Sequence, residues 1–131
     1  TQATVAYSDA FPLKAEEVST DRFIKIRKIG RGAIGVVYLV RMIEQYELES
    51  GEPDKNRKPK YYALKVVTKE EMIKKNKVSR VMTEREVLAT TSHPYVVKLY
   101  SSFQTKTKLY YVMEWMEAGE LYRVLQKQPG K

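Results

Sequence analysis

The spacing of apolar and polar side chains predicts a chain built mainly from strands. Residues 23–30 alternate between apolar and basic side chains, which is typical of a half-buried strand. The other predicted strands are rich in β-branched and aromatic residues; they cover residues 36–43, 61–68, 95–103 and 109–115. The first two predicted strands are joined by a glycine-rich turn, so they should form a hairpin.

The helical signals fall into three places. Thr68 and Glu71 have the spacing of a capping box, so a short helical piece should begin there. An approximate apolar stripe predicts the main helix near 77–91, and His93-Pro94 should end it, because the residue before proline disfavours helix. A short amphipathic helix is expected after Gly119.

Two segments lack a strong period. Residues 1–21 are predicted to form an extended leader. Residues 44–60 are predicted to be an insertion loop, because two prolines and a glycine interrupt any regular pattern. This loop is longer than most strand connections.

Composition removes several classes of function. The 131 residues include no cysteine, which excludes disulfides, thiolate metal sites and a cysteine nucleophile. The formal charge of +8 is distributed among interleaved acids, and no nucleic-acid-binding module is present, so no nucleic-acid partner is expected. No apolar run approaches the roughly 18 residues of a membrane span and no secretory signal is visible. A cytoplasmic protein is predicted, with peripheral membrane association of the full protein left open.

The motif GRGAIG at 30–35 has the G-x-G-x-x-G spacing that lets a backbone approach phosphates closely. A dinucleotide-binding turn would open a helix, but the β-branched residues that follow disfavour one. A Walker loop would end in Gly-Lys-Ser/Thr, and Val36-Val37 stands there instead. The motif therefore resembles a flap between two strands that closes over ATP, as in kinases.

Lys65 lies among apolar residues of a predicted central strand, where an ammonium group without a partner is costly. Glu84 is its predicted partner, because Val81 and Leu88 flank it at helical spacing and should turn it inward. An ion pair would keep Lys65 charged and aim it at phosphate oxygens. A purely structural salt bridge is the alternative.

Together these segments resemble the N-terminal lobe of an AGC-group Ser/Thr protein kinase. The resemblance covers residues 22–131 and is nearest to the fungal flippase-kinase and phototropin types, on the segments TEREVLATTSHPYVVKLYSSFQT and VLQKQPGK. It implies an α+β fold with a five-stranded antiparallel sheet and one major helix, helix C. The lobe would occupy residues 22–116, and residues 117–131 would lead from the hinge to a second lobe.

The resemblance also assigns ATP contacts by residue. The loop over the phosphates would comprise Gly30, Arg31, Gly32, Ala33, Ile34 and Gly35, with Ala33-Ile34 where the family has an aromatic. Adenine would contact Ile29, Val37, Ala63 and the backbone of Met116. Met113 takes the gatekeeper position, Glu114 the hinge and Glu120 the ribose contact. Lys65, held by Glu84, would bind the α- and β-phosphates.

The catalytic residues of the second lobe are not in this sequence. The catalytic-loop Asp and Asn and the metal-binding D-F-G Asp are missing, so the Mg²⁺ ligands of the complete enzyme lie elsewhere. His93 is predicted to be structural. The chain alone is expected to be inactive and to be a fragment of a kinase that acts on a protein substrate. A hydrophobic-motif tail or a regulator is expected at a helix-C pocket near Val81 and Leu109. The alternative is a non-catalytic, pseudokinase-like interaction module.

Overall fold

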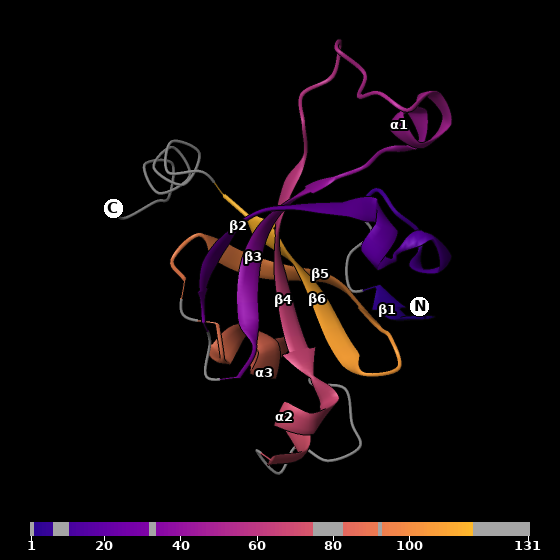
Figure 1. The fold of residues 1–131 in the computed structure, drawn as a ribbon. Coiled ribbons are helices and arrows are strands. Elements are labelled where there is room, and N and C mark those ends of the chain that lie inside the picture. The colour runs from indigo at the N-terminus through magenta and orange to yellow at the C-terminus, as the bar shows by residue number, and fades with distance from the viewer. Residues whose placement is uncertain (1, 7–10, 32–33, 75–82, 92, 117–131) are drawn as a thin grey trace.

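The structure is a computed structural model, and it describes residues 2–6, 11–31, 34–74, 83–91 and 93–116. The strands are β1 (Gln2–Ala6), β2 (Phe23–Arg31), β3 (Val36–Met42), β4 (Tyr61–Thr68), β5 (Val96–Gln104) and β6 (Lys108–Trp115). The helices are α1 (Gln45–Ser50), α2 (Lys69–Lys74) and α3 (Glu84–Ala89), with 3-10 turns at Ala15–Glu17 and Thr20–Arg22. Within these residues the fold is a single sheet with short helices at its ends (Figure 1).

The sheet has the strand order β1-β5-β6-β4-β3-β2, and every neighbouring pair is antiparallel. The five predicted strands and the antiparallel sheet are confirmed. The sequence pattern did not predict a sixth strand, β1, which the leader contributes. This strand pairs with β5 at the outer edge of the sheet. At the opposite edge β2 is less buried than predicted, with Ile24 and Ile26 exposed. Register shifts within β2 interrupt its regular alternation.

One side of the sheet, called here the leader face, packs against residues 11–18 of the leader. Phe11 and Leu13 are buried there against Tyr62, at the start of β4. The buried residues of this face are Phe11, Leu13, Val18, Phe23, Val40, Met42, Tyr62, Leu64, Phe103, Tyr110 and Val112. The leader is therefore part of the core, since without it this aromatic surface would meet water.

The other side, called here the hairpin face, packs against α2 and α3. Strand residues alternate between the two faces, so Ala63, Lys65 and Val67 of β4 turn toward this one. Its buried apolar residues are Ile34, Val37, Ala63, Val67, Met72, Val87, Leu99, Leu109, Tyr111 and Met113. Because both faces are covered, β4 and β6 read as nearly continuous buried strands.

The helical prediction needs a correction at Thr83. This residue is extended (φ −71°, ψ 163°) and caps α3, so a helix does not run through it from 77 to 91. The Thr83 hydroxyl accepts from the Glu86 amide at 3.3 Å, and the Glu86 carboxylate accepts from the Thr83 amide at 3.0 Å. This reciprocal capping box satisfies two amides that a helix start leaves without partners. Residues 77–82 and the predicted helix after Gly119 lie outside the described residues.

The insertion at 44–60 is not wholly a loop, as the sequence had suggested. It contains α1, which ends at Gly51 in the left-handed conformation (φ 83°) that favours glycine. Arg41 of β3 holds Glu47 of α1 through two charge-assisted hydrogen bonds of 2.7 and 3.1 Å. Figure 1 shows α1 standing off the sheet at the end opposite α2 and α3.

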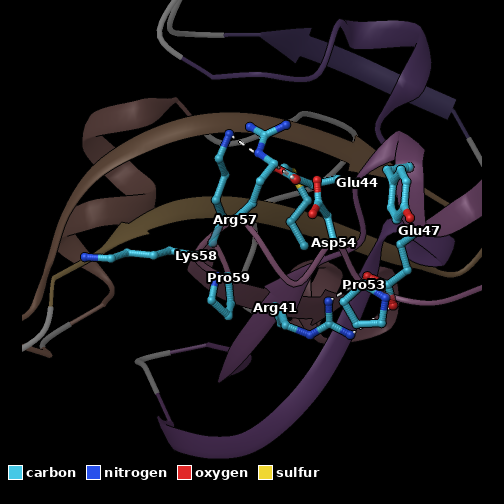
Figure 2. A pocket seen from close by; sticks show the side chains of 11 residues that line it. Arg41, Glu44, Glu47, Pro53, Asp54, Arg57, Lys58 and Pro59 are labelled. Carbon is cyan, nitrogen blue, oxygen red and sulfur yellow. Dashed lines mark hydrogen bonds and ion pairs between the residues drawn. The ribbon is translucent and has the colours of Figure 1, made fainter.

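The insertion encloses a cavity of about 150 Å³ lined by charged residues and prolines (Figure 2). Glu44 joins its two ends, because its carboxylate lies 3.5 Å from Arg57 Nε and 3.3 Å from Lys60 Nζ. Lys58 extends away from this group in Figure 2. These two ion pairs thus link the start of the insertion to its end at the surface.

Candidate functional site

The glycine hairpin between β2 and β3 is held against β4 by a close backbone approach. Gly35 has φ 78°, and a Cβ atom there would lie 2.6 Å from the Val66 carbonyl oxygen. Only glycine fits this position without a shift of the backbone. Gly30 has open space around it, so its lack of a side chain is not a packing requirement. Gly32 and Ala33 lie outside the described residues.

Ile34 at the hairpin tip is 3% exposed and packs in the hairpin face. The resemblance assigns Ile34 to the loop over the phosphates, at a position where the family has an aromatic. In this structure its side chain instead anchors the hairpin to the core. Arg31 is exposed at the end of β2.

Lys65 is fully buried in the centre of β4, between Val37 and Tyr111 of the neighbouring strands. Its ammonium donates to the hydroxyls of Thr90 and Thr91, the second at 3.2 Å. Both hydroxyls donate in turn to the Val87 carbonyl, at 2.9 and 3.0 Å. Burial lowers the pKa of Lys65 from 10.5 to about 8, and the negative charge of Glu71 partly opposes that shift.

Glu84 does not lie beside Lys65, so the predicted ion pair is absent from this structure. Glu84 is exposed in the first turn of α3, and Val87 is the residue that turns into the core. The helix begins at Thr83, which places Glu84 where an acidic side chain is stabilised by the helix dipole. Two features of the sequence could have predicted this arrangement. The T-x-x-E capping box at 83–86 marks the start of α3, and the hydroxyls of Thr90 and Thr91 after Ala89 offer Lys65 two acceptors.

Glu71 was predicted only as part of a helix cap. The Thr68 hydroxyl does accept from the Glu71 amide at 3.0 Å. The Glu71 carboxylate, however, reaches across to the hairpin and accepts from the Gly35 amide at 3.1 Å. The two residues are 36 positions apart, and no pattern in the sequence links them.

Three residues assigned to adenine gather in one place with the gatekeeper. Val37 and Ala63 are each at most 3% exposed in the hairpin face, Ile29 packs beside them, and the gatekeeper Met113 is buried in the same cluster. They belong to one packed cluster with Leu99 and Val87, and Ile29 and Val37 also line the cavity described below.

The hinge residues are engaged within the chain. The Met116 amide donates to the Tyr95 carbonyl at 3.0 Å. The Glu114 carboxylate accepts from the Tyr100 hydroxyl at 3.2 Å. Burial, together with the negative charge of Glu114, raises the pKa of Tyr100 to about 12. Glu120 lies outside the described residues.

A cavity of about 160 Å³ lies beneath the hairpin, between β2, β3 and the turn after α3. It is lined by Ile29, Gly30, Arg31, Val37, Thr91, His93 and Pro94. His93 is held by the Tyr95 amide, which donates to its Nδ1 at 3.3 Å, and by ring contacts with Tyr95 and Trp115. Sites for drug-sized ligands usually measure about 300–1,000 Å³, so this cavity is too small for a nucleotide without movement of the hairpin.

Within the part of the chain that the structure describes, no group of three or more His, Cys, Asp or Glu residues is arranged to hold a metal ion. In the same described ranges, none of the helices has the length and apolar character needed to cross a membrane.

Comparison with known proteins gives a consistent result. The family model for the protein kinase domain matches residues 23–130. Serine/threonine-protein kinase nrc-2 of Neurospora crassa is 44% identical over 124 residues, which cover 95% of this chain and 18% of that protein. Flippase kinase 1 of Saccharomyces cerevisiae is 46% identical over 114 residues, or 87% of this chain and 11% of that protein. Serine/threonine-protein kinase sgk-1 of Caenorhabditis elegans is 37% identical over 121 residues, or 92% and 23% respectively. The chain thus spans less than a quarter of the length of each relative.

Proposed function

The chain belongs to the protein kinase family, as the N-terminal lobe of the domain, and from this premise we propose that it binds ATP between the glycine hairpin and Lys65. The complete protein would transfer the γ-phosphoryl group of ATP to Ser or Thr of a protein substrate. A single observation carries the proposal: a fully buried lysine on the central strand, directly opposite Val37 of the hairpin. A buried ammonium group is costly, and groups kept in such positions are concentrated at functional sites.

In this proposal the chain's own residues bind and orient ATP and do no proton transfer. Val37, Ala63 and Met113 provide the apolar surface for adenine once the hairpin opens. Lys65 provides a positive charge for the phosphates, because burial lowers its pKa only to about 8 and it stays mostly protonated at neutral pH. Mg²⁺ would neutralise developing charge on the phosphates in the complete enzyme, and its ligands would come from outside this chain.

The test is an ATP titration of the chain by calorimetry, with Lys65→Met as the variant. We expect weak binding that Lys65→Met abolishes or reduces at least about tenfold, because a charge-assisted contact to phosphate is lost. Lys74→Met is the matched control, since Lys74 is exposed and pairs only with Glu70 on the surface of α2. Tight binding that Lys65→Met leaves unchanged would overturn the assignment of the site.

A non-catalytic interaction module is the second candidate, and the small cavity beneath the hairpin is the observation that favours it. The coding sequence that follows residue 131 separates the two candidates. A catalytic-loop Asp and a D-F-G motif in frame would support the kinase, and their absence would support the interaction module. Docking of a hydrophobic-motif tail near Leu109 and a cytoplasmic location both stay predictions.

A further inference from the structure

Glu71 lies where the glycine hairpin meets the strand that carries Lys65. Its carboxylate accepts from the Gly35 amide at 3.1 Å, and this hydrogen bond joins helix α2 to the hairpin. Gly35 adopts φ 78°, and a side chain there would meet the Val66 carbonyl oxygen, so this backbone conformation is reserved for glycine. In that conformation its amide points at the Glu71 carboxylate.

The same carboxylate acts on Lys65. It is the negative charge that favours the protonated form of the buried lysine, against the effect of burial. Glu71 is half-buried, so solvent only partly screens this attraction. One anionic group thus interacts with both of the groups that the proposed function assigns to ATP phosphates: a hairpin amide and the lysine ammonium.

The neighbouring acid on α2 does none of this. Glu70 is exposed, and its carboxylate lies 3.5 Å from Lys74 one turn further along. The start of α2 also does not depend on the Glu71 carboxylate, because the Thr68 hydroxyl accepts from the Glu71 amide. The contact with the hairpin is therefore not a by-product of capping.

We propose that the Glu71 carboxylate occupies the anion position beneath the glycine hairpin and competes there with a nucleotide phosphate. This inference rests on the proposed function. A carboxylate and a phosphate oxygen accept the same N–H bonds and attract the same ammonium group. Phosphate binding then requires Glu71 to leave, so Glu71 lowers the affinity for phosphorylated ligands and holds the hairpin against α2 in their absence.

The competition depends on charge, which makes it testable with ligands that differ only in phosphate. Glu71→Gln keeps the size of the side chain and removes its charge. We expect the variant to bind ATP about tenfold more tightly than the unmodified chain, since the competing charge-assisted bond becomes a neutral one. Adenosine should bind both proteins equally. Glu70→Gln is the matched control and should change neither affinity.

Four results would decide the matter. Tighter ATP binding by Glu71→Gln with unchanged adenosine binding supports the competition. Equal tightening for adenosine overturns it, because that result means a general loosening of the hairpin. If Lys65→Met abolishes ATP binding but Glu71→Gln leaves it unchanged or weaker, this inference fails while the proposed function stands. If Lys65→Met has no effect on ATP binding, the proposed function itself fails.

A second measurement avoids dependence on nucleotide affinity. The amide resonance of Gly35 reports directly on its acceptor, and inorganic tripolyphosphate serves as the probe. We expect that resonance to move on addition of tripolyphosphate, and to reach saturation at about tenfold lower concentration in Glu71→Gln. Glu71→Asp keeps the charge on a shorter side chain and serves if the Gln variant fails to fold; it should fall between the two. A Gly35 resonance that never responds to tripolyphosphate in any variant would overturn the inference.

Discussion

The two faces of the sheet differ in what they bury. The leader face closes over aromatic rings that stack on one another, such as Phe103 on Tyr110 with ring centres 4.7 Å apart. The hairpin face buries an equally large set of apolar side chains and, among them, the ammonium group of Lys65. The first arrangement gains stability from nearly every group it covers. The second keeps a charge in a costly position, which is typical of sites where function and stability conflict.

The largest effect is expected on the leader face. Phe103→Ala removes a ring that stacks on both Tyr110 and Phe23, so the free energy of unfolding should fall by about 3–5 kcal/mol. Urea unfolding followed by circular dichroism measures it. Tyr46→Ala is the control, because Tyr46 is 54% exposed on α1 and should cost at most about 0.5 kcal/mol. Equal losses in the two variants would mean that the leader face is not a packed core.

On the hairpin face, backbone geometry should be the next most sensitive feature. Gly35→Ala places a Cβ 2.6 Å from the Val66 oxygen at φ 78°, and should cost about 2–4 kcal/mol through overpacking and strain. Gly30→Ala, in open space, should cost at most about 0.5 kcal/mol. The same unfolding experiment compares the pair. A loss at Gly30 as large as that at Gly35 would contradict the geometry of the hairpin.

Lys65→Met should change stability in the opposite direction from both core substitutions. The lowered pKa of Lys65, about 8 against 10.5, corresponds to a burial cost on the order of 3 kcal/mol at neutral pH. Replacing the charge by an apolar side chain of similar length should therefore raise the free energy of unfolding by about 1–3 kcal/mol. Loss of stability in Lys65→Met would show that the lysine is better satisfied by Thr90 and Thr91 than this pKa implies.

The higher free energy of unfolding expected for Lys65→Met should also depend on pH. The unfolded chain holds the Lys65 proton up to pH 10.5 and the folded chain only to about 8, so the stability of the unmodified protein rises between these values. The advantage of Lys65→Met should thus shrink from pH 8 to 10.5. Tyr62 and Tyr100, whose pKa values burial raises to about 12, destabilise the fold above pH 10 in both proteins and cancel in the difference. A difference that stays constant with pH would contradict titration of Lys65 in this range.

The smallest effect is expected away from both faces. Arg41 and Glu47 join α1 to β3 through a bidentate pair, and the positive charge and hydrogen bonds of Arg41 lower the pKa of Glu47. A double-mutant cycle with Arg41→Met and Glu47→Gln should give a coupling energy below about 1 kcal/mol, because the pair is partly solvated. A coupling of several kcal/mol would place the insertion within the cooperative core.

Local patterns were enough to predict the five main strands and the burial of Lys65. The five strands follow from β-branched and aromatic runs whose two faces are both covered, and the buried position of Lys65 follows from its apolar neighbours on β4. The leader strand β1 was missed because an edge strand needs little apolar character of its own. The helix α1 was missed because its ends are held by Arg41 and Gly51, and neither is a signal within the helix itself.

The partner of Lys65 shows where prediction from spacing stops. A helical stripe pointed to Glu84, but the cap at Thr83 sets where α3 begins and thereby turns Glu84 to solvent. Glu84 lies three residues before the buried Val87 and so shares its side of the helix, but it stands in the first turn, where that side is no longer covered.

The sequence by itself determined the succession of strands along the chain, the glycine hairpin, the buried lysine and the likeness to a kinase lobe, because each depends on residues close together in the chain. Only the tertiary structure decided what surrounds that lysine. Thr90, Thr91 and Glu71 reach it from segments that local patterns do not connect, and the carboxylate of Glu71 meets the Gly35 amide across 36 residues. Charges and hydrogen-bond partners in a folded core depend on distances in space, and these are set by packing of the whole sheet.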